Sequence, residues 1–210
     1  MRPHPKPRHD IVPGMDRGSV RRIPTAEEER EKLSQPVQPY PPGYEDDVVL
    51  REGTTLHLRP ISPDDGPRLL TLYDKLSDTS LYHRFFAVPQ KDSVKADYLA
   101  HVDYENQFAL VATLNGEVVA VARYHRDLGR PDHAEVAFTV ADALQGKGIG
   151  SLLFARLAAI AETHSVTVFD AEVLKDNTGM IRVFEKSGRP MTRRTDGDLI
   201  HFEIQITLAG

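Results

Sequence analysis

The sequence of 210 residues contains no cysteine, and this absence excludes disulfide bonds, thiolate metal sites and a cysteine acyl-enzyme. It also lacks an apolar run of the about eighteen residues that a membrane-spanning helix needs. The first residues, MRPHPKPRHDIVPGMDRG, are basic but contain no apolar segment, so they do not resemble a secretory signal. The net charge of −5 gives no overall basic field that would attract nucleic acid. We therefore expect a cytoplasmic protein without membrane or nucleic-acid partners.

Two catalytic signatures are also missing. No GxSxG motif is present, which argues against a serine nucleophile of the hydrolase type. The nine histidines are scattered without an HExxH motif, and no cysteine stands beside them as a further ligand. We therefore predict that the protein binds no metal and forms no covalent acyl-enzyme.

The first 44 residues differ in composition from the rest of the chain. They contain nine of the fifteen prolines, and their only aromatic residues are Tyr40 and Tyr44. Such a segment buries too little apolar surface to offset the entropy of ordering it, so residues 1–44 are predicted to be a disordered, proline-rich tail. Within it, Thr25 and Glu28 form a capping-box pattern that favours one helix over residues 25–34. The basic residues of the tail either dock a partner or are simply solvated.

Residues 45–210 have the pattern of one mixed α/β domain. The strongest turn signal is Asn115-Gly116, which separates the two apolar strands of a hairpin. Ser62-Pro63-Asp64-Asp65 has the composition of a helix start, and Gly188 that of a helix end. Helices interspersed among strands indicate a single sheet with helices packed on it. We predict two strands within 47–61, helices after Ser62 and within 79–86 and 93–102, a hairpin over 107–126, a strand over 133–142, a helix after residue 148, a strand over 166–174, a helix over 177–188 and a strand over 199–206.

The segment Gln145-Gly146-Lys147-Gly148-Ile149-Gly150 packs three glycines into six residues and leads directly into a helical pattern. A glycine loop at a helix N-terminus is typical of phosphate binding. Backbone N–H groups converge on the anion there, and the helix dipole contributes about half a positive charge. Glycine allows the close approach that side chains would block.

Three phosphate loops compete for this segment. A P-loop fails because Gly148 follows Lys147 where serine or threonine is required. A dinucleotide fingerprint fails because Ser151 stands where its last glycine should fall. The pattern Gln/Arg-x-x-Gly-x-Gly/Ala is satisfied by Gln145, Gly148 and Gly150. A plain glycine-rich turn before a core helix remains the alternative, and the loop alone does not decide between them.

The wider context resembles the GNAT superfamily, whose members transfer acyl groups from acyl-CoA to amines. The resemblance is closest to the bacterial protein lysine acetyltransferases that regulate acyl-CoA synthetases. It implies a GNAT fold, with a central twisted, mostly antiparallel sheet flanked by helices and a splayed strand pair that binds acyl-CoA. The segments that carry it are LREGTTLHLRPISPDD, TSLYHRFF, VDYENQFALVA, VAVARYHR, AEVAFTVADALQGKGIGSLLFARL and AEVLKDNTGMIRVFEKSG.

The resemblance also implies how acetyl-CoA is held. The backbone of the strand segment Phe138-Thr139-Val140 would pair with the amides of the pantetheine arm, as a neighbouring strand does in a sheet. The glycine loop would hold the pyrophosphate. An asparagine at the start of the following helix would contact the same arm, although asparagine there also serves well as a plain N-cap. The expected coenzyme-binding residues are Phe138, Thr139, Val140, Gln145, Gly146, Lys147, Gly148, Ile149, Gly150, Ser151 and Asn177.

Amine acetylation needs a general base, because a lysine amine with a pKa of about 10.4 arrives protonated at neutral pH. Glu135 lies within a strand beside small side chains and just before the glycine loop, and the resemblance places the catalytic glutamate at this position. A solvent-facing strand residue is the alternative. Glu172 is a second carboxylate on a neighbouring strand, for which we favour a structural or orienting role. Phe184 stands where many family members have a tyrosine that protonates the leaving thiolate.

The region around His83, Arg84, His101 and Asp103 lies near the acceptor channel in the family fold, although isolated histidines are usually structural. Without a nucleophilic cysteine or serine motif, the sequence favours direct attack of the amine in a ternary complex. The expected function is acetylation of lysine ε-amino groups in proteins, with acyl-CoA synthetases as leading targets. A small-molecule amine acceptor and a non-catalytic acyl-CoA sensor remain alternatives. We expect a monomer or a homodimer.

Overall fold

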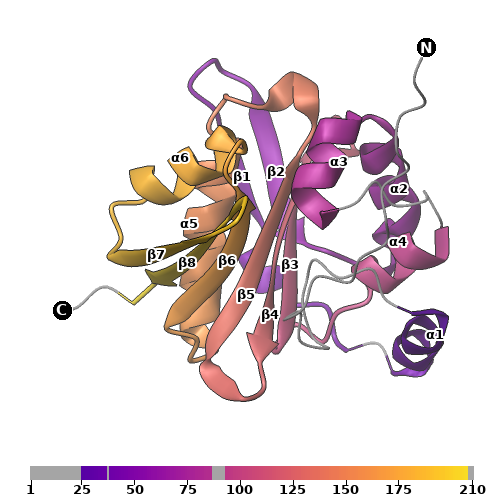
Figure 1. Ribbon diagram of the computed structural model, residues 1–210. Helices are drawn as coiled ribbons and strands as arrows, with labels where there is room; N and C mark the ends of the chain where they lie inside the picture. The colour runs from indigo at the N-terminus through magenta and orange to yellow at the C-terminus, as the bar shows by residue number, and fades with distance from the viewer. Residues whose placement is uncertain (1–24, 37, 87–92, 208–210) are drawn as a thin grey trace, which may run out of the picture.

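The computed structural model describes residues 25–36, 38–86 and 93–207, and it contains one eight-stranded sheet with helices against both faces (Figure 1). The strands are β1 (Asp46–Val49), β2 (Thr55–Pro60), β3 (Gln107–Leu114), β4 (Glu117–Asp127), β5 (Arg130–Val140), β6 (Val168–Leu174), β7 (Met191–Asp196) and β8 (Leu199–Gln205). The helices are α1 (Ala26–Ser34), α2 (Gly66–Asp74), α3 (Asp78–Phe85), α4 (Ser93–Ala100), α5 (Ile149–Thr163) and α6 (Thr178–Lys186), with short 3₁₀ turns η1 (Pro42–Tyr44), η2 (Pro63–Asp65) and η3 (Asp142–Leu144).

The strand order in the sheet is β1-β2-β3-β4-β5-β6-β8-β7. Neighbouring strands run antiparallel except for β5 and β6, which are parallel. The turn between β3 and β4 uses Asn115 and Gly116 at φ of 53° and 82°, as a tight hairpin requires. The predicted mixed α/β fold, with a mostly antiparallel sheet flanked by helices, is confirmed.

The two faces of the sheet are covered by different helices. Phe138 of β5 packs on Phe154 of α5, with ring centroids 6.2 Å apart. Arg123 of β4, which pairs in register with Ala137, instead donates a hydrogen bond to the Leu99 carbonyl of α4. Because successive strand residues point to opposite faces, α5 and α4 lie on opposite sides of the sheet. Figure 1 shows α2, α3 and α4 grouped on one side and α5 with α6 on the other.

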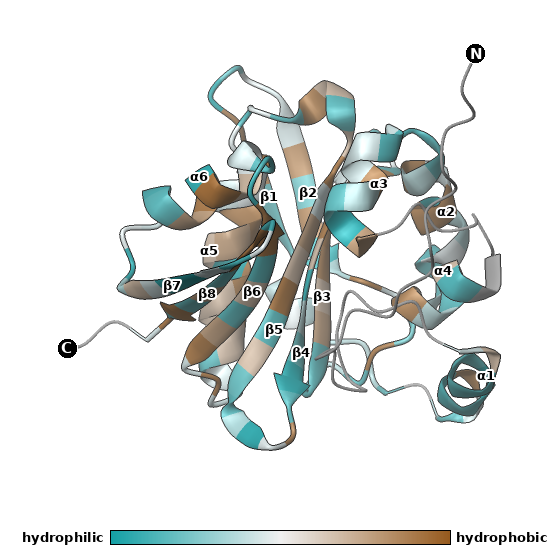
Figure 2. Ribbon diagram, viewed as in Figure 1, coloured by the Kyte–Doolittle hydropathy of each residue, from teal (hydrophilic) through white to brown (hydrophobic). Residues whose placement is uncertain are grey.

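The core on the α5 side is rich in aromatic rings. Phe184 of α6 lies between Phe154 and Phe202, at centroid distances of 5.7 Å and 5.3 Å, and Phe169 of β6 packs edge-on against Phe154. Phe169, Phe184 and Phe202 are at most 1% exposed. Figure 2 shows hydrophobic and hydrophilic bands alternating along β5 and β6, whereas helix α1 is largely hydrophilic.

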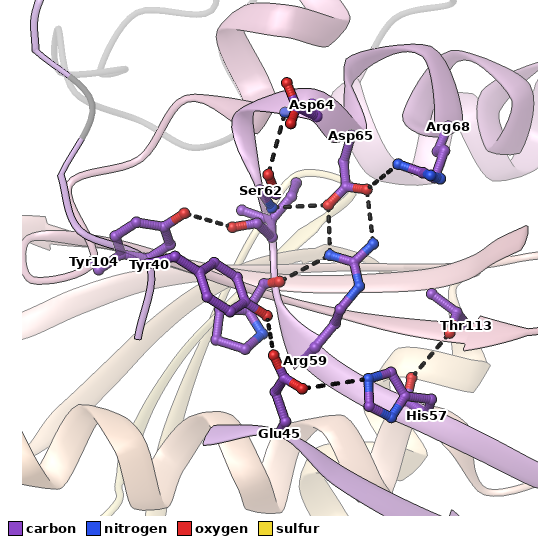
Figure 3. A network of polar contacts seen from close by, with 12 residues as sticks. Tyr40, Glu45, His57, Arg59, Ser62, Asp64, Asp65, Arg68, Tyr104 and Thr113 are labelled. Atoms are coloured by element: carbon purple, nitrogen blue, oxygen red, sulfur yellow. Dashed lines mark hydrogen bonds and ion pairs between the residues drawn. The ribbon is translucent and has the colours of Figure 1, made fainter. Parts of the chain in front are cut away.

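A buried ion pair fixes the start of α2 to β2 (Figure 3). The fully buried carboxylate of Asp65 accepts two hydrogen bonds from Arg59, at 2.6 Å and 2.7 Å, and one from the Ser62 amide at 2.8 Å. Burial acts to raise the pKa of Asp65, but the bonds from Arg59 and Ser62 outweigh it and lower the pKa. Ser62 also caps η2, so the predicted helix start is confirmed.

Part of the predicted tail has defined contacts. α1 begins at the Thr25–Glu28 capping box, as the sequence predicts. Tyr40 packs edge-on against Tyr104 and donates to Glu45 at 2.8 Å, while Tyr44 packs against Phe108. Residues 25–36 and 38–44 therefore include a helix and side chains docked on the domain. Residues 1–24 and 37 lie outside the described residues, and the division at residue 44 stays a prediction.

The other predicted elements are present, with one addition. β7 was not predicted from the sequence, because its residues Thr192 to Asp196 are all exposed and show no alternation of apolar and polar side chains. It pairs with β8 at the edge of the sheet. Within the part of the chain that the structure describes, no helix is long and apolar enough to cross a membrane.

Candidate acyl-CoA site

The parallel strands β5 and β6 pair over only a short stretch. Their register contains His133 with Val168, Ala134 with Phe169, and Glu135 with Asp170. β5 continues to Val140 and β6 to Leu174 without further pairing between them. On its other side, β5 keeps regular pairing with β4 through Val140. The backbone edge of β5 that faces β6 is therefore open beyond Glu135, which matches the predicted splayed pair.

A cavity of about 310 Å³ lies at this opening. The end of β5, the glycine loop with the first turn of α5, and one side each of α3 and α6 form its wall. The lining residues are Ser80, His83, Arg84, Phe138, Thr139, Val140, Leu144, Gln145, Gly146, Gly148, Ile149, Gly150, Ser151, Asn177, Gly179, Met180, Arg182, Val183 and Lys186. Ten of the eleven coenzyme-binding residues expected from the sequence are among them, and Lys147 is not.

The glycine loop has the geometry of an anion-binding turn. Gly146 and Gly148 have φ of 76° and 90°, in a region that side-chain-bearing residues rarely adopt. Gly148 is the N-cap of α5, and no side chain caps that helix end. The first amides of the helix therefore remain available to a ligand at the positive end of the helix dipole.

Gly150 is required for a different reason. It lies within α5, and a Cβ atom added there would lie 3.1 Å from Cγ2 of Val183 on α6. At Gly146 and Gly148, by contrast, no heavy atom lies within 4 Å of an added Cβ. The third glycine thus permits close packing of α5 on α6, which brings the two helices together at the cavity.

Gln145 connects the loop to α3. Its amide Nε2 donates to the Val140 carbonyl, the Ser80 hydroxyl and Asp142 Oδ1, at distances between 3.1 Å and 3.2 Å. Asp142 in turn accepts from the Ser77 amide and from Ser80 at 2.9 Å and 2.7 Å. Burial acts to raise the pKa of Asp142, but these hydrogen bonds outweigh it and lower the pKa. The carboxylate therefore stays ionised at the start of α3.

Thr139 provides a test of whether the cavity suits a ligand with amide groups. Its side chain is 6% exposed, and its hydroxyl oxygen is buried without a hydrogen-bond partner among the described residues. A buried hydroxyl without a partner is unfavourable by about 1–3 kcal/mol. A polar ligand in the cavity would satisfy it, and the open edge of β5 beside it offers backbone groups to the same ligand.

Asn177 is a helix N-cap, one of the two readings that the sequence left open, and its contact with a coenzyme arm stays a prediction. Its Oδ1 accepts the Met180 amide at 3.1 Å, so it caps α6, and it also lines the cavity. Phe184 is fully buried among aromatic rings and does not line the cavity, so it takes no part in proton transfer.

Glu135 lies at the last paired position of β5 and β6, where the strands begin to separate. It is half-buried and has His125 of β4 and Asp170 of β6 as its register neighbours. By alternation its side chain is on the same face as Thr139, about 13 Å along the strand. Glu135 is thus at the closed end of the splay, beyond the lining of the cavity.

A polar surface continues from Glu135 across β6 and β8. Asp170 contacts His133 and Arg130, each at 2.9 Å, and burial raises its pKa although the interactions with these two side chains act against the rise. Glu172 pairs with His201 at 3.1 Å. This pairing agrees with the structural or orienting role favoured for Glu172.

Lys147 is the one expected coenzyme ligand that the structure places elsewhere. Its Nζ lies 3.1 Å from Oε1 of Glu52, in the turn between β1 and β2. The ion pair directs the ammonium group away from the cavity wall. Lys147 directly precedes Gly148, which has a left-handed backbone conformation. The chain changes direction there, so the side chain of Lys147 does not have to face the same side as the neighbouring loop residues.

Sequence reasoning missed several cavity residues. Ser80 and Met180 were not singled out, and neither were the two cations Arg182 and Lys186. The i, i+4 spacing of these cations is the one signal that predicts a shared helix face. His83 and Arg84 do line the cavity, and His83 Nε2 lies 3.0 Å from Asp176 Oδ1.

His101 and Asp103 lie elsewhere. They line a smaller cavity of about 210 Å³ together with Lys32 and Gln35 of the N-terminal segment. The region expected near the acceptor channel is therefore divided between two cavities. Among the residues that the structure describes, no group of three or more histidine, aspartate or glutamate side chains is arranged to hold a metal ion.

Three features define an acyl-CoA-binding acetyltransferase fold: an open parallel strand pair, a glycine loop at a helix start, and a cavity beside them. The sequence matches the acetyltransferase (GNAT) family over residues 74–188, more than half of the chain, and the chain belongs to this family. It is 36% identical over 170 residues to the acetyltransferase Pat of Mycolicibacterium smegmatis, a match that covers 80% of this chain and 49% of Pat. The chain thus spans about half the length of that relative.

Two solved structures extend this comparison. The GNAT domain of S. lividans PAT is 40% identical, with a TM-score of 0.73, covering 80% of this chain and 99% of that domain. A cAMP-binding acyltransferase from Mycobacterium smegmatis is 31% identical, with a TM-score of 0.56, covering 87% of this chain and 51% of that protein. The chain therefore corresponds to an acetyltransferase domain of the Pat type.

Proposed function

We propose that this protein transfers the acetyl group of acetyl-CoA to the ε-amino group of lysine side chains in other proteins. The observation that carries the proposal is the open edge of β5 between Glu135 and the glycine loop. One end of this edge offers a carboxylate and the other a helix N-terminus. A long donor with an acyl group at one end and phosphates at the other suits that arrangement.

The residues around the cavity suit such a donor. The loop from Gly146 to Ser151 would hold the diphosphate through backbone amides. The backbone of Phe138 to Val140 would pair with the amides of the pantetheine arm, and the Thr139 hydroxyl would gain a partner. Acetyl-CoA would supply an activated thioester, and a backbone amide of β5 would polarise its carbonyl oxygen.

Glu135 acts as the general base in this proposal. It removes a proton from the lysine ammonium, directly or through one water, so that the amine is neutral when it attacks. The amine nitrogen forms a bond to the thioester carbonyl carbon, the carbon–sulfur bond breaks, and the second proton of the attacking nitrogen passes through water to the departing thiolate. A base of this kind contributes about 10²–10⁴-fold to the rate. Attack takes place in a ternary complex, because the chain contains no cysteine to carry the acetyl group.

Lysine side chains of proteins are the preferred acceptors for two reasons. The relatives with the highest identity described above carry the name Pat, and the sequence resembles the lysine acetyltransferases that regulate acyl-CoA synthetases. Glu135 is also only half-buried and lies outside the lining of the cavity, which suits an acceptor presented on the surface of another protein. Acyl-CoA synthetases are the proposed targets.

The test is transfer of labelled acetyl from acetyl-CoA to proteins in a host-cell lysate, with the wild type and Glu135→Gln compared. Bands labelled only by the wild type are expected, and mass spectrometry of those bands identifies the acceptor lysines. Transfer to small amines without labelled protein would instead indicate a small-molecule acetyltransferase. Binding of acetyl-CoA without any transfer would indicate a sensor.

A further inference from the structure

We propose that Arg182 and Lys186 bind the ribose 3′-phosphate of the coenzyme and thereby select coenzyme A over its 3′-dephosphorylated form. This inference rests on the proposed function, because it requires an acyl-coenzyme A in the cavity. It adds two binding residues and the chemical group that they recognise.

The two residues share one face of α6. They stand four positions apart in the helix, so their Cβ atoms are about 6 Å from each other, and both line the cavity. Both side chains are exposed, and neither takes part in an ion pair with any described residue. The neighbouring Arg189, by contrast, lies 3.4 Å from Glu162. The cations of α6 that face the cavity are thus the ones left available to a ligand.

The diphosphate is not the best partner for these cations. The amides of the glycine loop already suit it, and the loop adds no cationic side chain to the cavity because Lys147 pairs with Glu52. The acyl end of the donor must reach Glu135 at the closed end of the splay. The nucleotide end therefore lies toward the rim, where the exposed Arg182 and Lys186 are found.

The chemistry of a phosphate monoester fits this pair. Such a group carries about −1.5 to −2 charges at neutral pH and presents three acceptor oxygens. A guanidinium binds two of these oxygens at once, and an ammonium adds a point charge beside them. The cavity's third cation, Arg84, is only 3% exposed and belongs to its interior wall.

Calorimetric titration of the full chain with acetyl-CoA and with acetyl-3′-dephospho-CoA tests the proposal. The wild type should bind acetyl-CoA about 10-fold more tightly than the dephosphorylated analogue, from two exposed charge-assisted contacts of about 0.5–1 kcal/mol each. The double variant Arg182→Gln/Lys186→Gln should lose this preference, with acetyl-CoA binding weakened about 10-fold and analogue binding changed less than about 2-fold.

Arg193→Gln is the matched control, because Arg193 is an exposed cation that lies 3.8 Å from Glu185 and does not line the cavity. It should leave both affinities unchanged. Equal weakening of both coenzymes in the double variant would assign the cations to the diphosphate and overturn the proposal, as would no weakening at all. If the wild type bound neither coenzyme, the proposed function itself would fail.

Discussion

Glu135 of β5 faces Asp170 of β6 at the last register position that the two parallel strands share. Beyond this pair the two strands are no longer paired, and the end of β5 lines the cavity. This pair therefore marks the point on β5 where pairing with β6 ends and the open strand edge begins. The proposed base is held at the point where the acyl end of a donor lying along β5 would stop.

Gly148→Ala should weaken binding of acetyl-CoA and lower the stability of the fold. An alanine at φ of 90° is strained, at a cost of about 1–2 kcal/mol, although no heavy atom blocks its Cβ. Thermal melting and calorimetric titration measure the two effects. Gly43→Ala is the control, because Gly43 has equally open surroundings without a positive φ, and it should be neutral. Full affinity and stability in Gly148→Ala would contradict the described loop conformation.

Gly150→Ala should be destabilising because of packing rather than backbone strain. Its Cβ would lie 3.1 Å from Val183 Cγ2, so α5 and α6 would have to move apart by a few tenths of an ångström. Overpacking of this kind costs about 1–3 kcal/mol. The double variant Gly150→Ala/Val183→Ala removes the contacting methyl groups. Its melting temperature should therefore be higher than the value obtained by adding the changes measured for the two single variants. Strict additivity would refute the contact.

Asp65→Asn should destabilise the fold by about 3 kcal/mol at neutral pH, because it leaves the Arg59 guanidinium without its buried anion. The folded-state pKa of Asp65 lies below the unfolded value of about 3.9. The contribution of the pair is therefore complete above that value and is lost as the pH falls through the folded-state pKa. Urea unfolding at several pH values should show that the difference in unfolding free energy between wild type and Asp65→Asn becomes smaller below about pH 4.

Asp64→Asn is the control for this comparison, since Asp64 is exposed and adjacent in sequence. It should change the unfolding free energy by less than about 0.5 kcal/mol. A difference in unfolding free energy between wild type and Asp65→Asn that stays constant down to low pH would show that folding does not lower the pKa of Asp65.

Lys147→Gln should change acetyl-CoA affinity less than about 3-fold, because its ammonium group pairs with Glu52 and a half-exposed ion pair contributes about 0–1 kcal/mol. Calorimetric titration beside the Arg182→Gln/Lys186→Gln variant gives the comparison. A loss of tenfold or more in Lys147→Gln would mean that Lys147 exchanges Glu52 for a phosphate when the coenzyme binds.

The sequence was sufficient for most of the fold because its signals are local. Asn115-Gly116, the Ser62 cap and Gly188 each specify a turn or a helix end through their own backbone preferences. β7 was not predictable in this way, since its exposed residues carry no periodic pattern and it forms only by pairing with β8.

The same distinction between local signals and long-range contacts applies to the candidate site. The glycine loop could be predicted because its residues are contiguous. The structural reasons for two of its glycines could not be predicted. Gly148 is needed because its φ angle is positive, and Gly150 is needed because a methyl group of another helix lies close to it. The ion pair of the Lys147 side chain could not be predicted because its partner Glu52 is far away in sequence, and Ser80 was missed because only the fold brings it to Gln145.

The measurement that tests the central claim most directly is the comparison of wild type with Glu135→Gln in two assays on the same preparations. Calorimetry gives the dissociation constant of acetyl-CoA, and transfer of labelled acetyl to an acceptor protein found in the lysate gives the turnover rate. The account predicts an affinity changed less than about 2-fold and a turnover lowered by about 10²-fold or more, with a loss that diminishes as the pH rises and the amine deprotonates without help. Turnover equal to wild type would show that Glu135 is not the base.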